Sequence, residues 1–193
     1  MVDKKEYIMD IAKERFDRFG FKKTTVDEIC QDARISKKTL YEYFKDKEDL
    51  FVSLFMREAL ASRKVVLGRL KNIDEPLEKI KKFFKFAGEY FKKEPFMVKV
   101  LEDENGLYAP FLKKKYRTFV EEGILDFIAD IIKEGIKKGE LRDVDPHITA
   151  YIIFKLFQAF TYAKTMPLRG RQKSERKELN ELLTFLSEAL NKK

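Results

Sequence analysis

The chain has 193 residues, of which 44% are hydrophobic and 38% are charged, and its net charge is +8. This length and apolar content suffice for a folded core and exclude an intrinsically disordered chain. A single cysteine excludes an internal disulfide, and no segment has the apolar core of a signal peptide or the length of a membrane span. We therefore expect a cytoplasmic protein without membrane association.

Apolar residues recur at helical spacing along nearly the whole chain, and no segment shows the sustained alternation typical of strands. The pattern predicts an all-α protein. Short helices with tight turns occupy the N-terminal part, and longer, Phe-rich helices follow. We expect an N-terminal three-helix domain at residues 1–46 and a larger C-terminal helical domain at residues 47–193.

Capping residues mark the N-terminal helices. The first helix ends at Gly20, which we expect to be a left-handed cap. Thr25 and Glu28 form the capping box that starts the second helix. Ser36 caps a very short third helix, and Asp46 caps a long fourth helix. Short helices joined by a tight turn, with a basic outer face, are the helix-turn-helix pattern of DNA-binding proteins.

The basic outer face lies in residues 34–47, where five Lys and Arg residues face two acidic ones. Such a patch indicates phosphate binding, and a solvated face is the alternative. Lys37, Lys38 and Thr39 begin the third helix, where a recognition helix places its base-reading side chains. Tyr41 and Tyr43 follow with hydroxyl groups that can reach phosphates.

Two further residues, Thr25 and Lys47, lie where helices begin. Free backbone amides at a helix N-terminus favour a bound phosphate. We therefore add both to the expected DNA contacts, which position the protein on its site.

The region around these residues closely resembles the N-terminal DNA-binding domain of TetR-family transcriptional regulators over the stretch FGFKKTTVDEICQDARISKKTLYEYFKDKEDLF. The resemblance implies a homodimeric regulator, usually a repressor, whose C-terminal helices bind a small molecule and dimerise. The DNA contacts of the family carry over to Thr25, Ser36, Lys37, Lys38, Thr39, Tyr41, Tyr43 and Lys47. The implied function is sequence-specific DNA binding that ends when a small hydrophobic or amphipathic ligand binds the C-terminal domain and releases a palindromic operator.

The chain departs from the family pattern at the turn before the third helix. Arg34 stands where the family usually has glycine. If the turn keeps a positive φ, the arginine costs on the order of 1 kcal/mol. The alternative is a different turn with an added phosphate contact, so we include Arg34 among the expected DNA-binding residues. Lys38 replaces another frequent glycine, and Cys30 replaces a common alanine.

The C-terminal part predicts several longer helices. One runs from about 75 to 93, a short element follows up to Asn105–Gly106, and another helix ends at Gly139. Asp145 and Pro146 start a helix that reaches residue 166 and is apolar nearly all round. A basic loop leads to a last helix that Ser174 caps.

The last two helices together expose more apolar surface than one chain hides. We therefore expect a homodimer built on residues 145–190, with a purely internal core as the alternative. The expected interface residues are Ile152, Leu156, Phe160, Leu182, Leu183, Leu186 and Leu190.

Aromatic residues of the larger domain are candidates for an effector pocket, although aromatics at helical spacing are more often core. The candidates are Phe86, Tyr90, Phe119, Tyr151 and Phe154. His147, the single histidine, reads as a first-turn surface residue, and Cys30 reads as a buried structural thiol.

We expect no metal site, because the single histidine and the single cysteine lie in different segments. No catalytic set, phosphate loop or cofactor fingerprint is present, so we expect neither an enzyme nor a cofactor. Three function classes remain: an effector-responsive regulator bound to double-stranded DNA, a helical ligand-binding protein that no longer reads DNA, and a DNA-coating protein.

Overall fold

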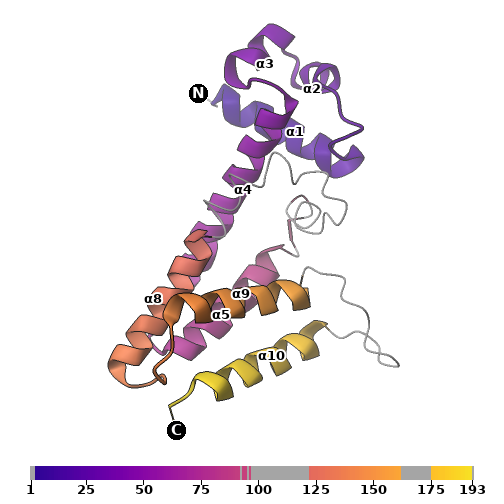
Figure 1. The fold of residues 1–193 in the computed structure, drawn as a ribbon. Coiled ribbons are helices and arrows are strands. Elements are labelled where there is room, and N and C mark those ends of the chain that lie inside the picture. Colours follow the sequence, from indigo (N-terminus) through magenta and orange to yellow (C-terminus); the bar gives the residue numbers. More distant parts are fainter. Residues whose placement is uncertain (1–2, 92, 95, 97–121, 162–174, 193) are drawn as a thin grey trace, which may run out of the picture. The chain divides into compact units, whose positions relative to one another are not determined.

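The computed structural model describes residues 3–91, 93–94, 96, 122–161 and 175–192. Throughout these ranges the named elements are all α-helices, which confirms the expected fold class (Figure 1). The helices are α1 (Lys4–Phe19), α2 (Val26–Ala33), α3 (Lys37–Tyr43), α4 (Lys47–Arg69), α5 (Pro76–Phe91), α8 (Glu122–Lys138), α9 (Pro146–Thr161) and α10 (Glu175–Leu190). No helix in this part of the chain is long and apolar enough to cross a membrane.

The chain forms two compact units, each with its own core. The first unit, called the head below, contains the described residues of Met1–Ala61 together with Glu94 and Phe96. The second unit contains those of Ser62–Lys93 and Lys115–Lys193. Helix α4 is continuous, and its beginning belongs to the head while its end belongs to the second unit. The functional boundary expected after residue 46 stays a prediction.

The head is built around an aromatic cluster. Phe16 of α1, Phe21 of the α1–α2 turn and Phe51 of α4 form mutual ring pairs with centroids 4.9–5.7 Å apart. Phe96 adds its ring to Phe51 at 5.3 Å. Such tilted and edge-on pairs are the favoured aromatic geometry. The cluster therefore joins α1 and α4 firmly underneath the two short helices.

Helix α1 ends as the sequence predicts but with a different cap. Gly20 follows its last residue, and the Gly20 amide donates to Phe16 O at 2.9 Å. Its φ of 80° is positive, but its ψ of 162° lies outside the left-handed helical region. The expectation of a left-handed cap was therefore wrong. The observed backbone is one that glycine alone adopts readily, because a Cβ clashes there.

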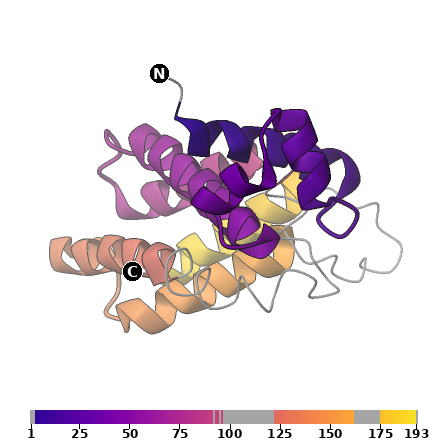
Figure 2. The same cartoon turned by 90° about the horizontal axis from the view of Figure 1, so that it is seen from above.

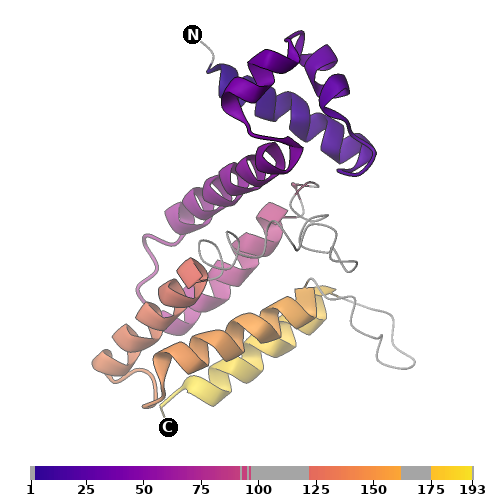
Figure 3. The same ribbon diagram turned by 45° about the horizontal axis from the view of Figure 1, so that its top comes forward.

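The second unit packs α5, α8, α9 and α10 around one apolar cluster. Helices α8 and α9 contact one another extensively, and Figures 2 and 3 show α9 alongside α10. Phe84 of α5 stacks on Phe157 of α9, with the ring centroids 4.2 Å apart. The Arg142 amide donates to Leu190 O at 3.1 Å, so the end of α10 is fastened to the α8–α9 connection.

Several helix boundaries match the sequence analysis. Asp145 accepts a hydrogen bond from the Ile148 amide at 2.8 Å, as expected of an N-cap before Pro146. Gly139 follows α8 with a φ of 75°. The expected short element up to Asn105–Gly106, apart from Phe96, lies outside the described residues, as do the basic loop before the last helix and its cap Ser174.

Candidate nucleic-acid interface

Thr25 caps α2 with the reciprocal hydrogen bonds predicted from the sequence. Its Oγ1 accepts from the Glu28 amide at 3.3 Å, and Glu28 Oε2 accepts from the Thr25 amide at 2.8 Å. The Thr25 hydroxyl also donates to Glu28 Oε2 at 2.9 Å. The amide and the hydroxyl of Thr25 are both engaged within the cap. The donors that remain for a phosphate at this helix end are the first-turn amides of Val26 and Asp27, which have no intrahelical acceptor.

Arg15 holds α1 against α2. Its Nε lies 2.5 Å from Asp32 Oδ2, and its Nη1 lies 3.1 Å from Glu28 Oε1. Hydrogen bonds from Thr25, backbone first, lower the pKa of Glu28, and the charge of Arg15 lowers it further. The hydrogen bond from Arg15 and its charge lower the pKa of Asp32. Both carboxylates are therefore firmly ionised at neutral pH, and α2 is fixed at both ends.

The turn between α2 and α3 keeps the backbone that usually calls for glycine. Arg34 has a φ of 53° and a ψ of 45°, which is the left-handed region. The Ile35 amide donates to Cys30 O at 3.0 Å, and this bond closes the turn. A non-glycine residue costs about 1 kcal/mol there. The Arg34 side chain is exposed, so the residue combines local strain with a free cationic group.

Helix α3 is held by its inner face and its cap. Leu40 is fully buried and Phe44 is 1% exposed. Ser36 Oγ accepts from the Thr39 amide at 3.1 Å, and the two hydroxyl oxygens lie 3.0 Å apart. The first turn of α3 is thereby fixed before any ligand arrives.

The outer face of α3 carries the predicted contact residues. Tyr41 is 50% exposed and Tyr43 is 37% exposed, which is unusual for large aromatic side chains. Lys38 is also exposed. Lys37 pairs with Asp27 of α2 at 2.5 Å, but both side chains are more than half exposed, so the pair contributes little and is easily exchanged for a phosphate.

Lys47 does not lie in the open position that we expected beside the α4 amides. Its Nζ donates to Phe21 O at 3.0 Å and to Thr24 O at 2.9 Å. The same ammonium lies 4.3 Å from the centroid of the Phe21 ring. Its partners are thus in the α1–α2 turn.

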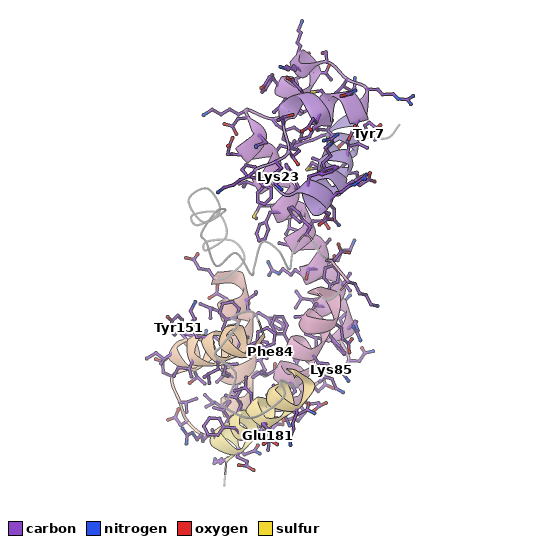
Figure 4. All side chains as sticks on the ribbon, turned by 90° about the vertical axis from the view of Figure 1, so that its right-hand side faces the viewer. Tyr7, Lys23, Phe84, Lys85, Tyr151 and Glu181 are labelled. Atoms are coloured by element: carbon purple, nitrogen blue, oxygen red, sulfur yellow. The ribbon has the colours of Figure 1, made fainter. Side chains whose placement is uncertain are left out.

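Sequence reasoning missed this link and two exposed lysines nearby. Lys22 and Lys23 lie in the same turn, and Lys23 is labelled in Figure 4. Their signal in the sequence was a basic pair directly before Thr24 and Thr25. The side-chain hydrogen bonds of Lys47 had no such signal, because they depend on where α4 begins in space.

The aromatic candidates for an effector pocket differ in how deeply the structure buries them. Phe154 is 4% exposed, Phe86 packs at the edge of the apolar cluster, and Tyr90 is half-buried. The Arg69 guanidinium lies 3.6 Å from the Phe86 ring centroid. Tyr151 is 50% exposed and lies at the outer side of α9, whereas Phe84 points into the core (Figure 4). Phe119 lies outside the described residues.

The expected interface residues of the last two helices also differ in their exposure. Leu182, Leu186 and Leu190 are at most 8% exposed and belong to the core of their own chain. They have almost no surface left for a partner, because α10 turns them toward α9. Ile152 is 50% exposed, Leu156 and Leu183 are half-buried, and the side chain of Phe160 lies outside the described part.

Other apolar side chains on these helices are exposed. Ile148 is 61% exposed, Phe185 is 62% exposed, and Tyr151 lies between Ile148 and Ile152 on one face of α9. We call Ile148, Tyr151, Ile152 and Phe185 the exposed apolar face. Contiguous exposed apolar side chains are typical of interaction surfaces.

The remaining single residues have unremarkable surroundings. His147 is exposed in the first turn of α9. Cys30 is 5% exposed, and burial raises its thiol pKa. Within the described ranges, no three His, Cys, Asp or Glu side chains lie close enough to hold a metal ion.

A short basic helix, capped and held on the head with its outer face exposed, is the arrangement of a helix-turn-helix DNA-binding protein. Comparison with family models agrees. Residues 8–54 match the model described as bacterial regulatory proteins of the tetR family, and residues 76–189 match the tetracyclin repressor-like C-terminal domain. The chain belongs to the TetR family of transcriptional regulators.

Individual proteins support this assignment. The chain is 30% identical over 168 residues to the HTH-type transcriptional regulator YhgD of Bacillus subtilis strain 168. The match covers 83% of this chain and 84% of YhgD. The fatty acid degradation regulator FadR from Bacillus halodurans matches with a TM-score of 0.74 at 19% identity, covering 96% and 95% of the two chains. AibR in complex with isovaleryl coenzyme A and operator DNA matches with a TM-score of 0.63 at 16% identity, covering 95% and 97%. The last two likenesses show the fold.

Proposed function

We propose that this chain is an effector-responsive repressor that reads a palindromic DNA operator through α3. The observation that carries the proposal is the division of α3 into two faces. Leu40 is fully buried, whereas Lys38, Tyr41 and Tyr43 are exposed on the other side. A surface helix without a partner has no need of two exposed tyrosines, but a helix in a major groove uses such groups on bases and phosphates.

The proposed DNA contacts fall into two classes. Lys37, Lys38 and Thr39 begin α3 and are assigned to base edges. The other contacts, assigned to the DNA backbone, are Thr25 through the α2 amides, Arg34, Ser36, Tyr41 and Tyr43. Contacts of the first class specify the sequence, and contacts of the second position the head.

Selection of bound sequences from a random duplex pool at near-physiological salt tests this assignment. We expect the wild type to enrich a palindrome and Lys38→Ala to relax the preference at defined positions, at a cost of about 1–3 kcal/mol. Lys85→Ala, which changes an exposed lysine of α5, is the matched control and should leave the motif intact. DNA binding without an enriched motif would instead favour the DNA-coating protein, whose affinity falls steeply with salt.

A dimer is the second part of the proposal, because one palindrome needs two heads. The exposed apolar face of α9 and α10 supports it. We assign the interface to this face, with the half-buried Leu156 and Leu183 at its margin. Ile152→Lys should turn a dimer into a monomer in sedimentation experiments and abolish tight operator binding. Lys133→Glu, at an exposed site of α8, should leave both unchanged.

A hydrophobic or amphipathic effector is the third part. The aromatic packing of the second unit supports it, as does the fold shared with AibR, whose complex contains isovaleryl coenzyme A. Since α4 is continuous between the two units, it is the proposed route by which the effector acts on the head.

The effector must bind the DNA-incompetent state more tightly, because otherwise no equilibrium shifts. Thermal shift and operator release, measured with a panel of fatty acids, acyl-coenzyme A thioesters and planar aromatic compounds, would identify the class. A response to small polar compounds alone would contradict the proposal.

A further inference from the structure

The α1–α2 turn carries the link between α4 and α2. Residues 20–25 form no regular structure, so the carbonyl groups that the turn and α2 leave without a good partner need one from elsewhere; these include Phe21 O and Thr24 O. The Lys47 ammonium supplies them at 3.0 Å to Phe21 O and at 2.9 Å to Thr24 O. The ring of Phe21 lies beneath the same ammonium, at 4.3 Å from Nζ. Two hydrogen bonds and one cation–π contact thus fix a single group.

The other bonds of the turn hold only its beginning. Gly20 O accepts from the Thr24 hydroxyl at 2.9 Å, and the Thr24 amide lies 3.4 Å from Phe21 O. Thr24 is fully buried, so its side chain is fixed. Its carbonyl group, directly before the N-cap of α2, receives its hydrogen bond from Lys47.

The backbone of Lys47 lies in the first turn of α4, which is fixed by hydrogen bonds. Asp46 Oδ1 accepts from the Asp49 amide at 2.7 Å, and Asp49 Oδ2 accepts from the Lys45 amide at 3.1 Å. These two bonds fix the first turn of α4 and the residue before its cap. The ammonium of Lys47 therefore transmits the position of a fixed helix end.

We propose that Lys47 is a positioning residue for DNA binding, whose ammonium sets the N-terminus of α2 by holding the carbonyl group that precedes its cap. This inference rests on the proposed function as a DNA reader. It replaces the phosphate contact that we expected for Lys47. An ammonium has three N–H donors, and two of them are directed at the turn. A move toward a phosphate would give up both bonds and the ring contact.

The link has a consequence for regulation. Only three residues, 44–46, separate the end of α3 from the beginning of α4. Lys47 gives α4 a second connection, to α2. A displacement of the first turn of α4 therefore moves the phosphate-facing end of α2 as well as the base-reading helix.

Amide hydrogen exchange of the free protein tests the link without DNA. In Lys47→Met, which keeps the aliphatic chain but loses all donors, the amides of Thr25 and Glu28 should exchange at least about tenfold faster. Lys47→Arg, which can donate to both carbonyl groups, should restore slow exchange. Lys45→Met is the matched control, because Lys45 is an exposed lysine two residues away. Unchanged exchange in Lys47→Met would overturn the proposal.

A double-mutant cycle tests the effect on DNA, using a duplex that carries the palindrome selected with the wild type. If Lys47 acts through α2, Lys47→Met and Thr25→Ala weaken binding by factors that do not multiply, and the salt dependence of Lys47→Met stays that of the wild type. A direct phosphate contact would instead give independent factors and a salt slope smaller by about one.

The two experiments separate two kinds of failure. If no palindrome is selected, the proposed function fails, while the exchange rates still decide whether Lys47 holds the turn. If Lys47→Met does not fold, Lys47→Gln, which retains two donors at a shorter reach, takes its place, and faster exchange is again expected at Thr25.

Discussion

The contacts between helices differ between the two compact units: the head has ion pairs between helices in addition to its aromatic cluster, whereas the second unit relies mainly on apolar contacts. In the head, ion pairs join different helices: Arg57 reaches Glu6 and Asp10 of α1, and Lys13 reaches Glu58 of α4 and Glu94. In the second unit, the ion pairs of α5 and α8 mostly lie within one helix, three or four residues apart. One exposed pair at 3.0 Å joins Arg69 of α4 to Glu89 of α5, and otherwise the described helices of this unit meet mainly through apolar side chains.

This difference in contacts between helices fits the tasks proposed for the two units. Apolar contacts are non-directional, so helices joined by them are less constrained in orientation than helices joined by hydrogen bonds. Hydrogen-bonded ion pairs have a fixed geometry and hold one arrangement. For the proposed function, a head that presents α3 to two half-sites would need fixed angles, whereas a unit that accommodates an effector would gain from tolerance. Four experiments, from the largest expected effect to the smallest, test this contrast.

Loss of a buried ring from the second unit should have the largest effect. Phe84 is 1% exposed and stacks on Phe157, so Phe84→Ala leaves a cavity between α5 and α9. We expect the free energy of unfolding to fall by about 3–5 kcal/mol. Urea titration followed by circular dichroism measures it. Val65→Ala, at a site that is 47% exposed, should stay within about 0.5 kcal/mol.

Loss of an inter-helix ion pair from the head should come next. The Lys13 ammonium lies 2.8 Å from Glu58 and 2.7 Å from Glu94, and Glu58 is 7% exposed. Burial alone would lower the pKa of Lys13, but the hydrogen bonds and charges of both glutamates outweigh burial and raise it. Lys13→Met should cost about 1.5–3 kcal/mol.

The control for Lys13 is a pair within one helix. Lys82 and Glu78 lie 3.3 Å apart on α5 and are both more than a third exposed. Lys82→Met should cost about 0.3–0.5 kcal/mol and nothing at high salt, whereas the cost of Lys13→Met should persist there. If Lys13→Met and Lys82→Met lowered the free energy of unfolding equally, the proposed difference between ion pairs in the two units would be wrong.

Arg34→Gly should stabilise the head by about 1 kcal/mol, because glycine adopts the φ of 53° without strain. Arg34→Ala keeps the strain and should give no gain. If Arg34 contacts a phosphate, both variants weaken operator binding. Thermal unfolding and binding titrations on the same samples compare stability with affinity, and a glycine variant less stable than wild type would contradict the account of the turn.

The smallest expected effect is a dependence on pH. The folded state lowers the pKa of Glu28 and Asp32 below their unfolded values. The stability that they contribute is therefore present above about pH 4 and is lost as the pH falls through the lowered values. Glu28→Gln with Asp32→Asn should make the head less stable at pH 7 and flatten its acid transition. Amide spectra of the head across pH 2–7 would show this.

Local signals made much of the head predictable from the sequence. The caps at Thr25 and Ser36 involve residues three positions apart, so their hydrogen bonds follow from spacing alone. The family pattern left two turns open at Arg34, and the structure has the strained one. The family itself, and the all-α fold, were predicted correctly for the same reason.

Predictions that depend on helix orientation were less reliable. The stripe of α10 was visible, but whether Leu182 and Leu186 face their own chain or a partner depends on how α10 lies against α9. Lys47 shows the same limit, since its partners are more than twenty residues away in the sequence. Spacing defines a face, and only packing defines what the face meets.

The single cysteine gives the head a built-in probe of local opening. Cys30 is 5% exposed on α2, and the pKa of its thiol is raised, so a thiol reagent reacts only when α2 opens. The labelling rate of the unmodified protein therefore reports the opening of α2 at one atom. DNA should slow this rate and an effector should restore it, so the wild-type chain supplies its own assay for both ligands.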